Sequence, residues 1–120
     1  MTYLYIFLGG GLGSLARYFV GKGVSVFMDS NFPLGTLFSN ILACAILALL
    51  VIGVNPQSEQ NSWVQPFLII GFCGGFSTFS TFSNETFQLF DQGNVVLAIL
   101  NILISVAVGI GLIFLIRSRA

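Results

Sequence analysis

Charge is scarce in this sequence, and histidine is absent. Four residues are basic and four are acidic, so 7% of the 120 residues are charged, whereas soluble domains average about 25%. The chain has no paired carboxylates and no nucleophile placed beside a base, so the usual constellations of acid–base and covalent catalysis are missing. These absences argue against a water-soluble protein and against an enzyme, and we expect no nucleic-acid partner.

Cysteine is also rare. The two cysteines, Cys44 and Cys73, both fall inside apolar tracts and form no CxxC pair. Small buried side chains explain them better than a disulfide or a metal site.

Apolar residues, by contrast, make up 56% of the chain. The tracts 30–58, 60–84 and 92–116 contain no charge, and each is long enough for a membrane-spanning helix of about 20 residues. A fourth span fits the first segment, where "MTYLYIFLGGG" lacks the basic start of a signal peptide. We therefore predict an all-α, multi-pass protein of the cell inner (plasma) membrane, surrounded by lipid. Its single domain, 1–120, contains helices at 3–27, 33–53, 63–90 and 94–116.

The basic residues are balanced between the two ends of such a bundle. Arg17 and Lys22 belong with the first and third connectors, whereas Arg117 and Arg119 lie at the end that holds both termini. With two basic residues at each end, the positive-inside rule favours neither orientation. The chain could therefore insert in both orientations, and two inverted copies could pair. Alternatively, Arg17 lies within the membrane and is not counted, which leaves a weak preference for the tail inside.

The first span contains the stretch "GGGLGSLARYFVGKG". Gly9 and Gly13 have GxxxG spacing, which favours close helix packing in a membrane, and the stretch lacks the βαβ context of a nucleotide-binding loop. Arg17 is a permanent cation at or near a span, and such residues are costly and usually functional. It could line a vestibule that attracts anions, or extend to the lipid headgroups.

In the second span, Thr36, Asn40 and Cys44 recur every four residues and so share one helix face. The amide of Asn40 offers two hydrogen-bond donors. Interhelical bonding and donation to a passing anion both remain possible roles for it.

The third span contains "GFCGGFSTFSTF", residues 71–82. The pair Gly74–Gly75 weakens a helix, and unwound backbone inside a bilayer must be buried in protein or line a cavity. We therefore predict a break near Gly74–Ser77, where free carbonyls could coordinate a cation. Beyond it, Phe76, Phe79 and Phe82 are spaced by three and predicted to share a face, either for packing or to present their positive ring edges to an anion.

Four stretches resemble the Fluc (CrcB) family of fluoride channels, and the resemblance covers essentially the whole chain. They are "GGGLGSLARY" (9–18), "PLGTLFSN" (33–40), "GFCGGFSTFSTFS" (71–83) and "NILISVAVG" (101–109), of which the third is highly specific. The resemblance implies a passive channel that exports cytoplasmic fluoride. It also implies an antiparallel, dual-topology dimer with two pores.

The same resemblance implies roles for particular residues. Backbone carbonyls of Gly74 and Ser77 from both copies would hold a central structural Na⁺, and Arg17 would lie in a vestibule. The fluoride pore would be lined by an amide, two phenyl rings and a set of hydroxyls: Asn40, Phe79, Phe82, Ser80, Thr81, Ser83, Ser105 and Thr36.

The chain departs from the family pattern at three positions. Ser77 replaces a frequent Thr, Asn101 a frequent Tyr, and Ala43 a usual Gly. Ser77 would act through its carbonyl, so its change costs little, whereas Asn101 leaves the contribution of the last helix to the pore open. The balanced basic residues favour a homodimer over a pair with a homologous second chain.

An alternative is a small four-helix, dual-topology multidrug antiporter. Such a protein should carry a carboxylate inside its first span, but no acidic residue precedes Asp29. Glu85 is the one acid within any expected span, and it lies toward the end of the third.

Overall fold

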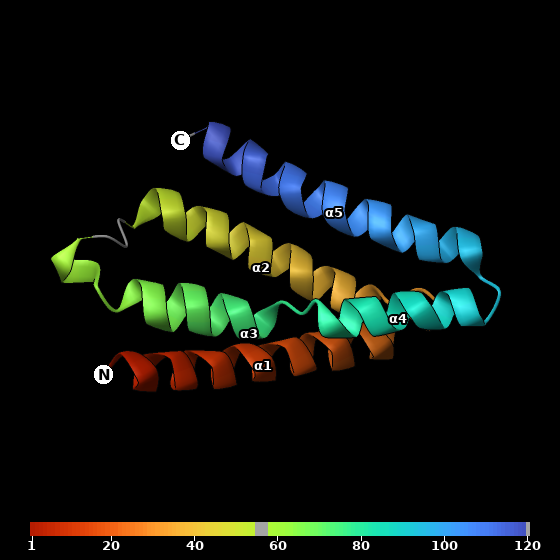
Figure 1. Ribbon diagram of the computed structural model, residues 1–120, viewed down its shortest axis with the longest axis horizontal. Coiled ribbons are helices and arrows are strands. Elements are labelled where there is room, and N and C mark those ends of the chain that lie inside the picture. The colour runs from red at the N-terminus through yellow and green to blue at the C-terminus, as the bar shows by residue number, and fades with distance from the viewer. Residues whose placement is uncertain (55–57, 120) are drawn as a thin grey trace.

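The computed structural model describes residues 1–54 and 58–119, and these residues are helical with no strand among them. The expected all-α fold with four helical segments is confirmed. The first, second and last are the continuous helices α1, α2 and α5, whereas the third is divided (Figure 1). The helices are α1 (Thr2–Phe27), α2 (Leu34–Gly53), η1 (Glu59–Asn61), η2 (Gln65–Cys73), α3 (Gly74–Phe76), α4 (Ser80–Asp91) and α5 (Val95–Ser118).

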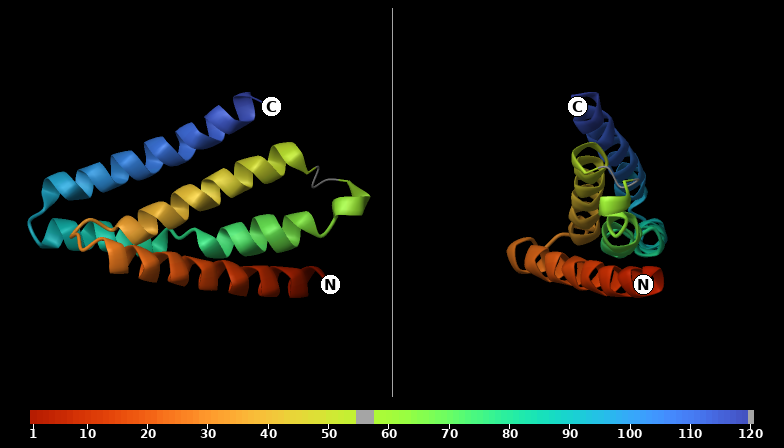
Figure 2. Two further views of the ribbon diagram at one scale, coloured as in Figure 1. Left: turned by 180° about the vertical axis from the view of Figure 1, so that it is seen from behind. Right: turned by 90° about the vertical axis from the view of Figure 1, so that its left-hand side faces the viewer.

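Successive spans run in opposite directions. Both termini and the connector that contains η1 lie at one end of the bundle, and the α1–α2 and α4–α5 connectors lie at the other (Figure 1). Helix α1 packs against η2, α3 and α2, while α5 packs against α2 and α4. Figure 2 shows α1 and α5 at opposite margins of the bundle, with the divided span and α2 between them.

Three of the spans are apolar and long enough to cross a bilayer: Leu34–Gly53, Gln65–Asp91 and Val95–Ser118. Helix α1 has 26 residues and extends roughly 39 Å, which is enough to cross, although its glycines lower its hydropathy. Large apolar side chains cover its outer surface, including Phe7 and Phe19, which are 76% and 62% exposed. Such a surface suits contact with lipid or with another chain.

Glycine lets α1 lie backbone to backbone against the third span. A Cβ added at Gly9 would collide with the carbonyl oxygen of Phe67, and one at Gly13 with that of Phe72. Only hydrogen fits in these gaps, so the GxxxG spacing serves helix packing as the sequence predicts. Gly75 belongs to the same contact, since a Cβ there would strike the carbonyl of Gly10.

The third span is broken from Ser77, the last residue of the predicted range Gly74–Ser77. It starts as the wide π-helix η2 and continues through α3, so both Gly74 and Gly75 remain helical. The helix stops at Ser77, whose backbone is extended (φ −81°, ψ 158°), and resumes at Ser80. The break predicted near Gly74–Ser77 is therefore present at the Ser77 end of that range, and the two glycines stay helical, with Gly75 allowing the approach of α1.

The break also separates the phenylalanines that the spacing predicts on one face. Phe76 lies before the break, buried and edge-on to Phe72 with ring centroids 5.6 Å apart. Phe79 and Phe82 lie at and beyond the break, with their ring centroids 6.0 Å apart. Phe76 is thus a core residue, and only the other two remain together.

Candidate functional site: a braced helix break between two cavities

The side chain of Asn40 holds the break in the third span. Its Nδ2 donates to the carbonyl oxygen of Thr78 at 3.2 Å, and its Oδ1 accepts from the backbone N–H of Thr78 at 2.8 Å. An interrupted helix leaves backbone groups such as these without helical partners, and unpaired backbone groups are costly in a bilayer. Because an amide NH₂ carries two protons, Asn40 keeps one more N–H to offer.

The break leaves several carbonyl groups without their usual helical donors, among them those of Gly74 and Ser77. In an unbroken α-helix, the amides of Thr78 and Thr81 would bond to the carbonyls of Gly74 and Ser77. Here Thr78 donates to Asn40, and Thr81 donates to the Thr78 hydroxyl oxygen at 3.2 Å, which caps the start of α4. Carbonyl oxygens of this kind are suitable ligands for a hard cation such as Na⁺. The chemistry of Gly74 and Ser77 therefore fits the cation that the resemblance implies.

A cavity of about 270 Å³, here called the phenyl cavity, opens beside the break. It brings together four predicted pore residues, Asn40 from α2, Phe79 and Phe82 from the third span and Ser105 from α5. Its remaining lining residues are Cys44, Ser77, Thr78 and Val106. The cavity thus combines neutral hydrogen-bonding groups with two aromatic rings, and its lining contains no formal charge.

A buried chain of hydrogen bonds runs from this cavity into the interface of α5 with α4. Ser105 Oγ donates to Asn101 Oδ1 at 3.3 Å, and Asn101 Nδ2 donates to Thr86 Oγ1 at 2.9 Å. Thr86 Oγ1 donates in turn to the carbonyl oxygen of Phe82 at 2.7 Å. Asn101 is 1% exposed, so this side chain lies behind the cavity wall.

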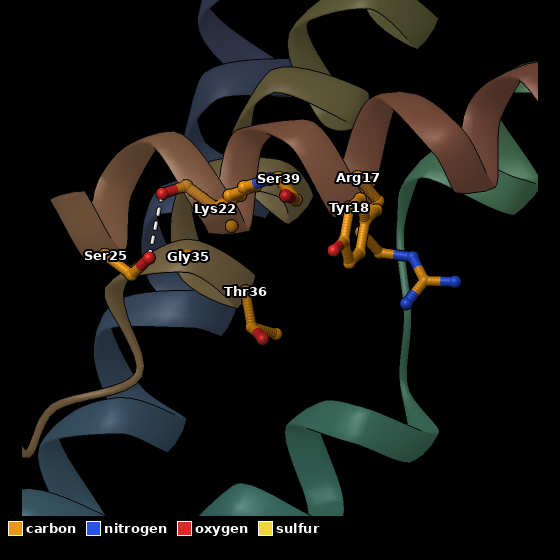
Figure 3. A pocket seen from close by; sticks show the side chains of 8 residues that line it. Arg17, Tyr18, Lys22, Ser25, Gly35, Thr36 and Ser39 are labelled. Carbon is orange, nitrogen blue, oxygen red and sulfur yellow. Dashed lines mark hydrogen bonds between the residues drawn. The ribbon is translucent and has the colours of Figure 1, made fainter.

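A second cavity, here called the basic cavity, lies between α1 and α2 and measures about 470 Å³. Arg17 and Lys22 from α1 line it together with Thr36 and Ser39 from α2 (Figure 3). The hydroxyl of Ser39 is buried and has no hydrogen-bond partner among the described residues. Two cations and a hydroxyl without a partner make this cavity attractive to an anion.

Arg17 connects the basic cavity to the broken span. In Figure 3 its guanidinium reaches from α1 toward the segment that follows α3, and its Nε donates to the carbonyl oxygen of Gly75 at 3.1 Å. Arg17 is half-buried, so part of its side chain lies against the protein. The donors at the end of its guanidinium stay available to an anion.

The remaining predicted pore residues lie apart from the phenyl cavity. Thr36 lines the basic cavity and donates to Glu85 Oε1 at 2.6 Å, so its hydroxyl proton is already in use. Ser80, Thr81 and Ser83 are on the first turns of α4, where Ser80 and Ser83 are exposed and Ser80 Oγ lies 3.4 Å from Thr78 Oγ1. These hydroxyls follow the outer side of the third span.

Sequence reasoning missed four residues of this arrangement. Thr78 and Thr86 work through bonds to residues far along the chain, which no local pattern displays. Ser39 looks like any small residue in an apolar span. Glu85 could have been found, because a carboxylate within a span is costly and needs a partner such as Thr36.

Comparisons with known proteins show the family of the chain. The family model described as "CrcB-like protein, Camphor Resistance (CrcB)" matches residues 4–116. Proteins named "Fluoride-specific ion channel FluC" are similar over nearly their whole length. The protein from Pyrococcus abyssi (strain GE5 / Orsay) is 48% identical, over 95% of this chain and 91% of the relative. The protein from Flavobacterium psychrophilum is 38% identical, over 91% of this chain and 88% of the relative. The protein from Coxiella burnetii (strain CbuK_Q154) is 43% identical, over 89% of this chain and 87% of the relative. This multi-pass membrane protein therefore belongs to the CrcB family.

Proposed function

We propose that the protein is a passive, fluoride-selective ion channel. The observation that carries this proposal is the phenyl cavity, where Asn40, Ser105 and two phenyl rings meet beside a broken helix without any charged side chain. The relatives named as fluoride channels support the choice of ion. No catalytic constellation is found among the described residues, so transport suits the site better than chemistry.

Neutral groups suit a path for a small, strongly hydrated anion. Conduction requires that the ion bind well enough to leave water and weakly enough to move on. The spare N–H of Asn40 replaces a water donor, and the positive ring edges of Phe79 and Phe82 favour an anion without a full charge. A buried lysine at this point would hold the ion too tightly. A path selective for fluoride must in addition be too narrow for larger halides.

The basic cavity serves as the vestibule of the path. Arg17 and Lys22 raise the local concentration of anions, and both face a cavity lined by hydroxyl groups. Ser80, Thr81 and Ser83 on α4, with Thr36 on α2, form a polar track between this vestibule and the rings. Glu85 accepts a hydrogen bond from the Thr36 hydroxyl, which limits the positions along the track where an anion can bind.

The direction of transport follows from the chemistry of hydrogen fluoride. The neutral acid crosses lipid unaided and ionises in the less acidic cytoplasm, where the anion is trapped. A selective pore then lets fluoride leave, and an inside-negative potential drives it outward. Export therefore needs neither a catalyst nor a coupled ion.

Two inverted copies form the functional unit in this proposal, with one pore on each side. Phe79 is 79% exposed in the single chain. In the pair, the second copy would cover this ring and close the side of the pore that one chain leaves open. The released carbonyls of Gly74 and Ser77 from both copies would hold a structural Na⁺, which supplies a fixed positive charge joining the two breaks.

Fluoride release from liposomes tests the proposed function. Purified protein is reconstituted in vesicles loaded with potassium fluoride, and valinomycin is added so that K⁺ leaves with the anion. We expect a fluoride electrode to record rapid release, and almost none when the vesicles contain chloride and a chloride electrode is used. A trace as flat as that of protein-free vesicles would refute the channel.

Single-cysteine labelling tests the inverted pairing. Cys44 and Cys73 are replaced with alanine, and Gln92→Cys places one exposed thiol in the α4–α5 connector. Because the basic residues are balanced, an impermeant maleimide should label about half of the chains in intact cells, and the rest after permeabilisation. Labelling of nearly all or nearly none before permeabilisation would contradict dual topology.

A further inference from the structure

Ser105 is the one hydroxyl that α5 contributes to the phenyl cavity, and its proton is directed away from that cavity. A hydroxyl carries a single proton, and that of Ser105 is used on Asn101 Oδ1. In this arrangement Ser105 offers an anion only lone pairs. For Ser105 to bind fluoride, its hydroxyl must turn.

Asn101 controls this turn without touching the cavity. It is 1% exposed and is not among the residues that line the phenyl cavity or the basic cavity. The three bonds from Ser105 through Asn101 and Thr86 to the Phe82 carbonyl all donate in the same direction. Such a chain is cooperative, so a reversal at one member favours reversal at the next.

An amide can support both directions, because it carries an acceptor and a donor at the two ends of one planar group. A half turn of the Asn101 amide would place Nδ2 toward Ser105 Oγ and Oδ1 toward the Thr86 hydroxyl. Ser105 would then accept a hydrogen bond and present its proton to the cavity. Leucine has a similar size but can form no hydrogen bond with Ser105 or Thr86 in either direction. An aspartate carboxylate can accept hydrogen bonds from them but cannot donate one.

We infer that Asn101 is a positioning residue for the ion path, which can hold the Ser105 hydroxyl proton on its own side chain or turn it toward an anion in the phenyl cavity. The inference rests on the proposed fluoride channel and deepens it, since it assigns a role to a residue that never contacts the ion. It also explains why a polar side chain is buried in a mostly apolar helix whose residues Leu100 and Ile102 are exposed.

A double-mutant cycle on fluoride efflux tests this role. Asn101→Leu should slow efflux about tenfold, the effect of losing one hydrogen bond to a charged ligand. Ser105→Ala should slow it by a similar factor. When both changes are combined, efflux should match that of Ser105→Ala alone to within about twofold, because Asn101 acts through the Ser105 hydroxyl. Asn101→Asp should be as slow as Asn101→Leu, since a carboxylate keeps the Ser105 proton turned away.

The outcomes separate this inference from the proposed function. A flat trace from the unmodified protein would refute the channel itself. An active parent in which Asn101→Leu costs the same factor with and without Ser105 would refute the positioning role, because a purely structural residue behaves in that way.

If Asn101→Leu does not assemble, Thr86→Val and Thr86→Ser decide instead. The valine should slow efflux only when Ser105 is present, and the serine, which keeps the hydroxyl, should restore the parent rate.

Discussion

Asn40→Leu is expected to reduce fluoride efflux about a hundredfold or more, the largest loss for any single side chain here. The change removes two functions at once. The anion loses the spare N–H of the amide, and Thr78 loses the partner of both its N–H and its carbonyl group. The unpaired backbone groups should also destabilise the folded protein by about 1–3 kcal/mol each, which a thermal melt in detergent would detect.

Two further variants separate these functions. Asn40→Asp keeps an acceptor for the Thr78 N–H but removes every donor and adds negative charge, so it should melt closer to the parent and still block efflux. Leu49→Ala changes a residue of α2 that is 55% exposed and does not line the phenyl cavity, and it should leave efflux within about twofold. Efflux from Asn40→Leu near the parent rate would contradict the assignment of Asn40.

The helices could be predicted from the sequence because lipid imposes a simple requirement. Each span needs an uncharged run of sufficient length, and such runs are visible without knowledge of their neighbours. The break was predictable to within a few residues, since it starts at Ser77, the end of the predicted range Gly74–Ser77. Gly74 and Gly75 are weak helix formers, yet they stay helical because Gly75 allows α1 to approach, and the chain unwinds at Thr78, where Asn40 supplies the missing partners.

The candidate site was predictable only in part, for the same reason. The spacing of Thr36 and Asn40 correctly places them on one face of α2, but the two residues meet different segments of the third span. Asn40 reaches the break, whereas Thr36 reaches Glu85 on α4. The direction of a hydroxyl proton, as at Ser105, depends on contacts between helices that no periodicity records.

Phe79→Ile and Phe82→Ile should each slow fluoride efflux about tenfold or more, an effect comparable with the loss of one hydrogen bond to a charged ligand. Isoleucine keeps much of the apolar volume but lacks the positive ring edge, so the anion would give up water without compensation. A purely packing role predicts a different ranking. Phe82 is half-buried and should then matter for stability, whereas Phe79, at 79% exposed, should matter little to the isolated chain.

Phe87→Ile provides the matched control for these rings. Phe87 is on α4, is 64% exposed and does not line the phenyl cavity, so its replacement should leave efflux unchanged. Size-exclusion chromatography should show that all three variants assemble as the parent does. If Phe79→Ile and Phe82→Ile assemble normally and conduct as fast as Phe87→Ile, the rings only pack. A specific loss at Phe79 would instead show that a side chain exposed on one copy forms part of a path that only the pair completes.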